Sequence, residues 1–184
     1  MPCKEESKKA RKCAIRYLAY KDRSGNEITR YLKSKGCSED VVNKTLTFLK
    51  DNSYINDPQF ALQFGRSRIE NKKVGKLRLE RELKDKGFEN QIIRGTLNSL
   101  YEEYDERKIA MSCAKKKLQS LLSKDIKKTR GRLARFLERK GFAADITYRV
   151  VTQLVPNIPN KDFGHSFSLT DKQYQKTTSP RIKD

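Results

Sequence analysis

Apolar residues recur at fixed distances from three glycines along the chain, Gly36, Gly87 and Gly141. Each glycine follows a segment in which apolar residues recur at helical spacing and lysine stands near the end. A glycine in this place is typical of a helix end, because glycine accepts a left-handed backbone without a Cβ clash. Apolar residues ten and thirteen positions after each glycine keep the i, i+3 spacing of a second helix. The pattern predicts three helix, glycine, helix hairpins, whose apolar positions are Ile28, Leu32, Leu46 and Leu49; Leu79, Leu83, Leu97 and Leu100; and Leu133, Leu137, Val151 and Leu154.

A further apolar-periodic segment precedes each hairpin, around Ala14, Ala61 and Ala110. The distance from these alanines to the glycines grows from copy to copy, which suits a surface loop, because loops tolerate insertion at small entropic cost. Units that repeat about every 50 residues indicate a tandem array, so the predicted fold is all-α with three three-helix modules in an elongated arrangement. The expected organisation is a flexible N-terminus at 1–9, module 1 at 10–56, module 2 at 57–105, a basic module 3 at 106–156, and a disordered or extended polar tail at 157–184.

Several residues of module 2 and of the hairpins are assigned to structure. Asp57 is expected to cap the first helix of module 2, with Pro58 at the first helical position, where its missing N–H costs nothing. Phe60 and Phe64 are expected to face the core. Helix termination explains the glycines, which are Gly36, Gly87 and Gly141.

In module 1, the helical spacing of Cys13, Tyr17 and Tyr20 predicts a stripe that faces the core. A second helix is expected over 27–35, and Ser38 is a suitable N-cap for the third. In module 2, opposite charges at i, i+4 along the helix that starts at Lys76 predict a self-neutralised, solvated face; the expected pairs include Arg78 with Glu82 and Glu82 with Lys86.

The composition narrows the classes of function. Only 35% of the residues are hydrophobic and the mean hydropathy is −0.87, which suits an array that exposes more surface per residue than a sphere. No apolar run approaches the roughly 18 residues of a membrane span, and the polar start does not resemble a signal peptide. We therefore expect a cytoplasmic protein without membrane contact.

The residues that usually carry catalysis or bind metals are sparse. The only histidine, His165, lies in the polar tail, and there is no phosphate-binding loop or Ser/His/Asp constellation. An acidic run at 101–106 could bind a metal, but no further ligand converges on it, so a charged helix end is favoured. The cysteines are too scattered for a zinc pattern and are interpreted as reduced, partly buried residues: Cys3, Cys13, Cys37 and Cys113. The sequence predicts no enzyme, cofactor or metal.

The charge is unevenly distributed. The net charge is +19, and module 3 alone holds 14 basic residues against 4 acidic ones, whereas module 2 holds 10 against 9 and module 1 holds 10 against 5. On the helix that ends at Lys140, a basic stripe and the core stripe lie on different faces. The stripe consists of Lys128, Arg132, Arg135 and Arg139 and has almost no acids at i, i+4. We therefore expect it to be a face that binds a polyanion or an acidic protein surface; the alternative is excess surface charge without a partner.

Several segments stand in an order that is specific to one family. They are Tyr54-Ile55-Asn56-Asp57 with Phe60-Ala61, Gly75 before the second hairpin, Leu83 to Phe88, and Arg135-Phe136-Leu137 with Lys140-Gly141-Phe142. Over about residues 10 to 154 the chain resembles RecX, the bacterial regulatory protein that modulates the RecA recombinase. Departures are Pro58, the tail beyond 156, and Cys37, where the later copies have phenylalanine.

The resemblance implies an extended, curved all-α molecule that binds RecA–DNA filaments along their helical groove. It also implies inhibition of recombinase, ATPase and co-protease activity, and hence a role in DNA repair, recombination and the SOS response. On this basis we expect a monomer that contacts RecA and single- or double-stranded DNA. The candidate binding residues are Arg66, Arg68, Lys72, Lys73, Lys76, Lys115, Lys116, Lys128, Arg132, Arg135, Arg139 and Lys140.

Two other classes of protein remain open. Short helical hairpins resemble helix-turn-helix units, so the chain could be a helical-repeat DNA-binding protein that acts without RecA. It could also be a helical adaptor scaffold, which would bind an acidic protein and have no affinity for DNA. The salt dependence of binding, and whether it requires a RecA filament, separates these classes.

Overall fold

The chain folds into helices throughout the part that the structure describes. The computed structural model describes residues 4–121 and 125–156, and within them it contains nine α-helices, one π-helical turn and no strand, which confirms the predicted all-α class. The elements are α1 (Lys4–Tyr20), α2 (Gly25–Ser34), α3 (Glu39–Asp51), α4 (Asp57–Ser67), the π-helical turn η1 (Arg68–Lys72), α5 (Lys76–Asp85), α6 (Asn90–Glu103), α7 (Glu106–Gln119), α8 (Ile126–Lys140) and α9 (Ala144–Leu154).

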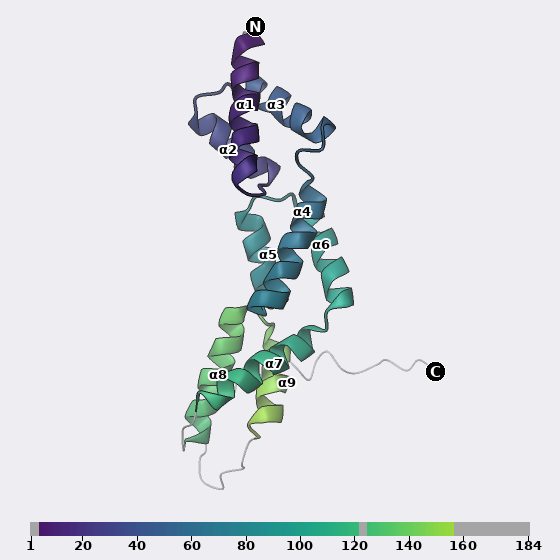
Figure 1. Cartoon of the computed structure of the whole chain (residues 1–184). Helices are drawn as coiled ribbons and strands as arrows, with labels where there is room; N and C mark the ends of the chain where they lie inside the picture. Colours follow the sequence, from purple (N-terminus) through teal and green to yellow (C-terminus); the bar gives the residue numbers. More distant parts are fainter. Residues whose placement is uncertain (1–3, 122–124, 157–184) are drawn as a thin grey trace, which may run out of the picture.

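The helices form three small bundles, each with its own apolar core. Ile28, Leu32 and Leu49 are fully buried between α1, α2 and α3. Leu79, Leu83 and Leu100 take the corresponding places in α4 to α6, and Leu133 and Leu137 do so in α7 to α9. Figure 1 shows the bundles following one another along the molecule, which is elongated. The predicted array of three-helix modules is confirmed.

The start of the chain differs from the prediction. Helix α1 begins at Lys4, so residues 4–9, expected to belong to a flexible N-terminus, are helical. Glu5 and Glu6 lie in the first turn, where the helix dipole favours negative charge, and Ala10 is buried in the module core. The expected core stripe of module 1 is also wrong at one position, because Tyr20 is 90% exposed at the last turn of α1. The predictions for residues 1–3, Cys3 and the 157–184 tail lie outside the described residues.

The three hairpin glycines end their helices as predicted. Their φ angles are 81°, 77° and 87° at Gly36, Gly87 and Gly141, in the left-handed region. At the third copy, the N–H of Gly141 donates to the carbonyl of Glu138 (2.8 Å) and the N–H of Phe142 donates to that of Leu137 (3.2 Å). The same pair of bonds closes the other two helices, so each is a Schellman motif.

Helix capping differs from the prediction in detail. The residue that caps α4 is Asn56, whose side chain accepts the N–H of Gln59, and Asp57 is already the first helical residue. Asp57 instead reaches back to module 1, where its carboxylate accepts the N–H of Gly25 at 2.9 Å. Helix α2 begins earlier than expected, because Ser24 and Glu27 form a reciprocal capping box. Ser38 occupies the N-cap of α3 without a side-chain hydrogen bond.

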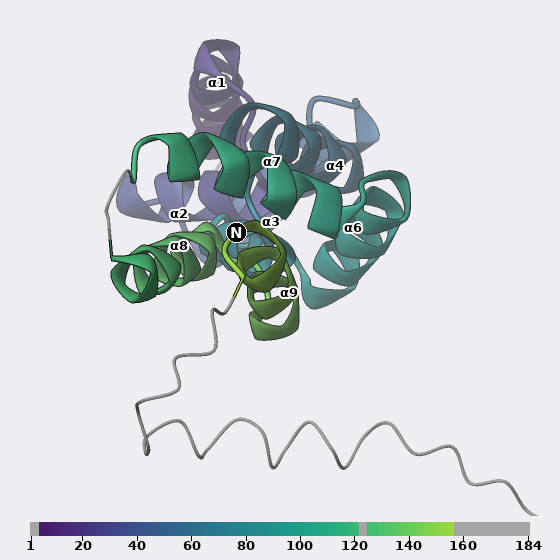
Figure 2. The same cartoon turned by 90° about the horizontal axis from the view of Figure 1, so that it is seen from below.

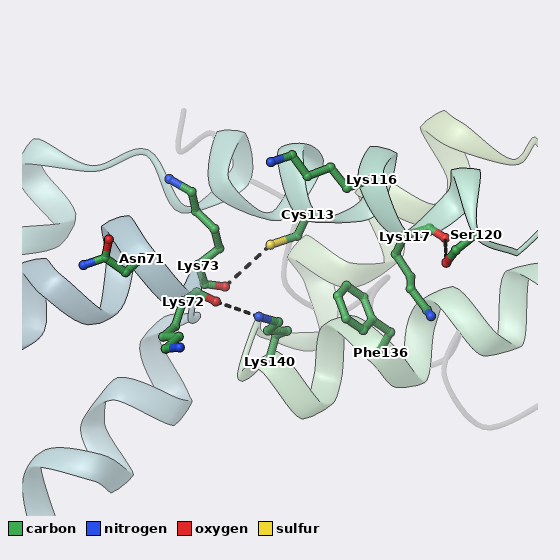
Figure 3. A pocket seen from close by; sticks show the side chains of 9 residues that line it. All are labelled: Asn71, Lys72, Lys73, Cys113, Lys116, Lys117, Ser120, Phe136 and Lys140. Carbon is green, nitrogen blue, oxygen red and sulfur yellow. Dashed lines mark hydrogen bonds between the residues drawn. The ribbon is translucent and has the colours of Figure 1, made fainter.

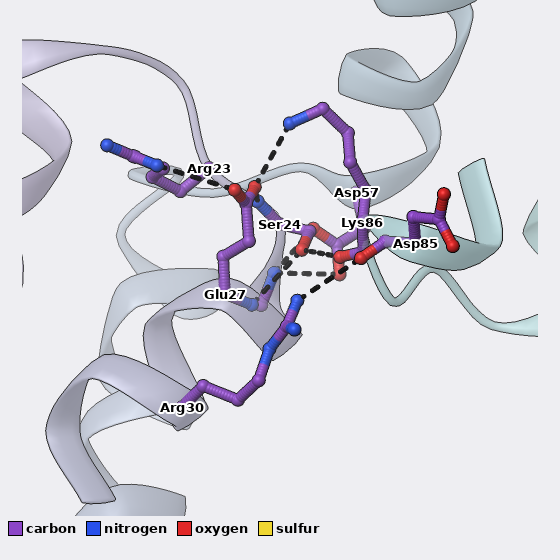
Figure 4. A network of polar contacts seen from close by, with 8 residues as sticks. Arg23, Ser24, Glu27, Arg30, Asp57, Asp85 and Lys86 are labelled. Atoms are coloured by element: carbon purple, nitrogen blue, oxygen red, sulfur yellow. Dashed lines mark hydrogen bonds and ion pairs between the residues drawn. The ribbon is translucent and has the colours of Figure 1, made fainter. Parts of the chain in front are cut away.

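The second helices of the three modules, α2, α5 and α8, lie end to end (Figure 1). At the first junction, the carbonyl of Lys86 just beyond α5 accepts the hydroxyl of Ser24 at the N-cap of α2 (2.5 Å). Lys86 was expected to pair with Glu82, but its ammonium lies 3.3 Å from Glu27 across the junction (Figure 4). Arg30 of α2 donates to the carbonyl of Asp85 (3.4 Å). Modules 1 and 2 are therefore joined through the end of α5.

The second junction repeats this arrangement with direct backbone bonds. The N–H groups of Gly75 and Leu77, at the start of α5, donate to the carbonyls of Lys140 (2.8 Å) and Gly141 (3.1 Å) at the end of α8. The partial negative end of one helix dipole thus faces the partial positive end of the next. A Cβ on Gly75 would lie 2.4 Å from the Gly141 carbonyl oxygen, so only glycine allows this approach.

The hairpin glycines end their helices, and Gly141 also leaves room for the neighbouring module. Substitution can separate these two roles. A Cβ at Gly141 would lie 2.2 Å from the Cβ of Arg78, whereas one at Gly36 would meet nothing within 4 Å. We expect Gly36→Ala to cost about 1–2 kcal/mol of unfolding free energy, the strain of a left-handed L-residue. Gly141→Ala should cost more, because it also displaces module 3. Urea denaturation measures both variants, and equal losses would contradict docking through this glycine.

The first junction should respond to acid. Burial acts to raise the pKa of Glu27, but the Ser24 N–H and the charge of Lys86 outweigh it, so this pKa lies below its ordinary value of 4.5. A lowered carboxyl pKa stabilises the fold above the unfolded value and stops doing so as the pH falls through the folded one. We expect the Tm advantage of the wild type over Glu27→Gln to be full above about pH 4.5, to shrink as the pH falls below that value, and to vanish once Glu27 is protonated in the folded protein.

The matched control for this titration is Glu39→Gln, because the Glu39 side chain is 77% exposed in a surface pair with Lys33. Its Tm should follow that of the wild type across the whole pH range. An advantage of Glu27 over glutamine that is as large in acid as at pH 7 would show that its charge does not hold the junction.

Candidate functional site

The basic stripe of α8 lies on the surface of the last module. Arg132, Arg135 and Arg139 are exposed, and no carboxylate lies within ion-pair distance of them in the part of the chain that the structure describes. Leu133 and Leu137 on the other face are fully buried, so the predicted separation of the two stripes is confirmed. In the view along the molecule, α8 lies at the edge of the third bundle (Figure 2). The fourth stripe residue, Lys128, pairs with Asp125 (3.3 Å) in the first turn.

Two of the candidates in module 2 are held by acids of the same module. The guanidinium of Arg66 lies 2.8 Å from Glu103, at the end of α6. Arg68 lies 2.5 Å from Glu82 of α5, which also accepts a hydrogen bond from Arg78 (2.9 Å). Burial acts to raise the pKa of Glu82, but the two guanidinium groups outweigh it and lower that pKa. These pairs fasten η1 and α4 to the rest of the module, so Arg66 and Arg68 are already engaged.

Most of the remaining candidates meet at the junction of modules 2 and 3. They line a shallow pocket of about 330 Å³ between the η1–α5 connection and helices α7 and α8 (Figure 3). Its lysines come from both modules, so only the folded array brings them together. The lining residues are Asn71, Lys72, Lys73, Cys113, Lys116, Lys117, Ser120, Phe136 and Lys140.

Backbone carbonyls fix the inner side of this pocket. The ammonium of Lys140 donates to the carbonyl of Lys72 (2.6 Å), and the thiol of Cys113 donates to that of Lys73 (3.6 Å). Burial raises the pKa of Cys113, although Lys140, Lys73 and Lys116 act to lower it. The thiol is therefore a protonated hydrogen-bond donor, and several positive charges lie close to it.

Two candidates lie outside the pocket. Lys76 sits at the start of α5, where its N–H donates to the carboxylate of Glu106 (2.8 Å) and its ammonium lies 6.0 Å from the ring of Tyr101. Lys115 is exposed on α7. Among residues 4–121 and 125–156 no group of three or more histidines, cysteines or acids is placed to hold a metal. In the same ranges no helix is both long and apolar enough to cross a membrane.

Comparison with known proteins identifies the family. Residues 10–49, 56–97 and 104–151 match, in this order, the first, second and third three-helix domains of RecX. The Regulatory protein RecX of Clostridioides difficile is 31% identical over 150 residues, which are 80% of this chain and 68% of that protein. The chain belongs to the RecX family. The RecX of Bacillus subtilis is also 31% identical, over 82% of this chain and 56% of that protein.

Solved RecX structures share the fold. The crystal structure of RecX from Lactobacillus salivarius superposes with a TM-score of 0.74 at 23% identity, over 83% of this chain and 98% of that one. A crystal structure of a regulatory protein RecX gives a TM-score of 0.70 at 22% identity, over 80% and 72% of the two chains. The chain spans about half the length of several curated RecX relatives, 54% in the case of the Geobacillus protein. The curated relatives are named regulatory proteins.

The candidates predicted from the sequence left out several residues of the pocket between modules 2 and 3, among them Lys117 and Phe136. Lys117 is the fifth lysine of the pocket, and Phe136 is only half-buried, with the ammonium groups of Lys117 and Lys140 near its ring. The signal in the sequence is the i, i+4 spacing of Phe136 and Lys140, which places an ammonium over an aromatic ring on one helix face.

The ion pairs of module 2 lead to a prediction about Arg68. Replacing Arg68 with methionine leaves Glu82 with one partner, so we expect a loss of about 1–2 kcal/mol of unfolding free energy. Affinity for DNA should remain within about twofold of the wild type, because the removed charge was neutralised. Urea denaturation and fluorescence anisotropy measure the two quantities. A variant of unchanged stability with much weaker DNA binding would return Arg68 to the binding residues.

Proposed function

We propose that this RecX-family chain is a non-catalytic regulator of RecA, which binds RecA–DNA filaments in their helical groove and inhibits recombinase, ATPase and co-protease activity. The observation that carries the proposal is the set of three exposed arginines on α8, Arg132, Arg135 and Arg139, which have no carboxylate within ion-pair distance among the described residues and lie at one end of an elongated array. An elongated molecule can follow a groove and contact adjacent protomers, and a positive field attracts surfaces rich in phosphate or carboxylate. Membership of the RecX family supports RecA as the partner.

The proposed contacts come from modules 2 and 3. The α8 stripe supplies Arg132, Arg135 and Arg139, and the junction pocket supplies lysines from both modules. Because Arg66 and Arg68 are paired within module 2, they are assigned to the stability of the array. The cytoplasm, where RecA filaments form, is the compartment in which such a regulator acts.

Charge reversal on α8 tests this proposal. Replacing Arg132, Arg135 and Arg139 with glutamate should abolish inhibition of RecA ATP hydrolysis on single-stranded DNA, because the stripe would repel the filament. The positions are exposed, so helix content by circular dichroism should be unchanged. A matched control reverses three exposed charges of module 1, Lys12 and Arg16 of α1 and Lys21 just after it, and should keep most of the inhibition. Full inhibition by the α8 variant would contradict the assignment.

A binding titration on naked and on RecA-coated DNA distinguishes this regulator from a DNA-binding protein that acts without RecA. Binding driven by phosphate contacts alone weakens steeply with salt and proceeds equally well on naked DNA. The proposed regulator should instead bind RecA-coated DNA more tightly and saturably. Equal affinity for naked and RecA-coated DNA would favour the independent DNA-binding protein.

A further inference from the structure

The pocket between modules 2 and 3 combines a hydrophobic floor with five lysines from the two modules (Figure 3). Phe136 and Cys113 form the floor, and Lys72, Lys73 and Lys116 lie on the rim with exposed side chains. The rim comes from module 2 on one side and from module 3 on the other. A ligand that fills the pocket therefore contacts both modules at once.

The lysines of the pocket are not neutralised by the protein. None of the five, Lys72, Lys73, Lys116, Lys117 and Lys140, has a carboxylate within ion-pair distance among the described residues. Five ammonium groups around one small hollow repel one another, and an anion placed among them relieves this repulsion. All five are lysines, which bind phosphate as point charges, and because they attract carboxylates in the same way, the charges alone do not select the anion.

The aromatic floor adds a second kind of contact. The ring of Phe136 has the ammonium groups of Lys117 and Lys140 at 5.9 Å and 5.8 Å from its centroid. An aromatic ring beside positive charges is the arrangement that proteins use to stack an unpaired base while holding its phosphate. Asn71 and Ser120 lie at the edge of the pocket. The Asn71 amide donates to Ser67 (3.2 Å) and the Ser120 hydroxyl donates to the carbonyl of Lys117 (2.8 Å), which leaves the Asn71 carbonyl oxygen and the Ser120 oxygen to accept hydrogen bonds from a base.

The backbone that presents Lys72 and Lys73 is itself unusual. A π-helical turn precedes Lys73, which adopts φ 50° and ψ 53°, a left-handed conformation that is unfavourable for lysine. Such features concentrate at functional sites. Here the contacts of Lys140 and Cys113 to the two carbonyls hold the segment, and they place both side chains on the rim.

We propose that this pocket binds one nucleotide unit of a single-stranded nucleic acid, with its phosphodiester among the lysines and its base against Phe136. The inference deepens the proposed function, since a filament groove contains DNA, but it concerns binding by this chain alone. A duplex fits less well, because its bases are already stacked and cannot reach the floor. An acidic peptide would use the charges but not the ring.

A fluorescent reporter can be placed at the floor, because the chain contains no tryptophan. In the full-length Phe136→Trp variant, a short oligothymidylate should quench the tryptophan emission by stacking on it. A hairpin duplex of equal phosphate content and polyglutamate should quench it far less. Phe48→Trp in module 1, which also has a cation over its ring, is the matched control and should not be quenched at the same concentrations.

The outcomes of the fluorescence titration all decide the question. Quenching by the single strand alone supports the pocket. Equal quenching by the duplex, or no quenching, would overturn it. Quenching by polyglutamate would also overturn it and would point to an acidic protein partner.

A second set of variants leaves the floor intact. Lys72→Gln, Lys73→Gln and Lys116→Gln combined should weaken binding of labelled oligothymidylate by about tenfold or more, with a shallower dependence on salt. The control removes the same charge at three exposed lysines of module 1, Lys12, Lys21 and Lys50. If both triple variants lose affinity equally, net charge explains the binding and the pocket does not.

These results are separable from those on RecA. A pocket variant that no longer binds single strands but still inhibits RecA ATP hydrolysis would leave the proposed function standing. An α8 variant that no longer inhibits, together with unchanged binding by the pocket variants, would refute only the pocket.

Discussion

The end-to-end contact between second helices is the constraint on which the rest of the structure depends. The last carbonyls of α8 accept N–H groups from the start of α5, and the end of α5 meets the capped start of α2 in the same sense. Helix ends leave polar backbone groups that need partners, and here the neighbouring module supplies them. Modules of about 50 residues bury little apolar surface alone, so contacts between neighbours contribute to the stability of each one.

The charge is distributed unevenly along the array that this contact holds together. In module 2 the acids nearly equal the basic residues in number, and Glu80, Glu82 and Glu103 pair with basic side chains of the same module, so this central part of the array is nearly neutral. Module 3 has few acids, and its α8 is anchored by its C-terminal end while the rest of the helix extends away from module 2. The result is an elongated molecule with a positively charged end, and a lysine pocket at the point where that end begins. Both surfaces depend on the same junction.

The periodicity of apolar residues was sufficient to predict the helices and the glycine termini, because both are local features of the sequence. The modules followed because the same spacing recurs three times along the chain. The junctions could not be predicted in this way. Asp57 looks like a local cap, yet its partner Gly25 is 32 residues earlier. In the sequence, Arg66 looks available for binding, but the fold places Glu103, 37 residues later, beside it. Lys72 and Lys140, which meet in the pocket, are 68 residues apart. Charge patterning alone does not show which cations the fold neutralises.

The most direct test breaks the second junction without changing any charge. A side chain at Gly75 cannot coexist with the Gly141 carbonyl oxygen 2.4 Å from its Cβ, so Gly75→Val should displace module 3 while its helices persist. The measurement is inhibition of RecA ATP hydrolysis on single-stranded DNA, with helix content followed by circular dichroism. If the junction positions the binding surfaces, inhibition falls at least about tenfold at unchanged helicity. Full inhibition by this variant would show that the basic residues act without the array.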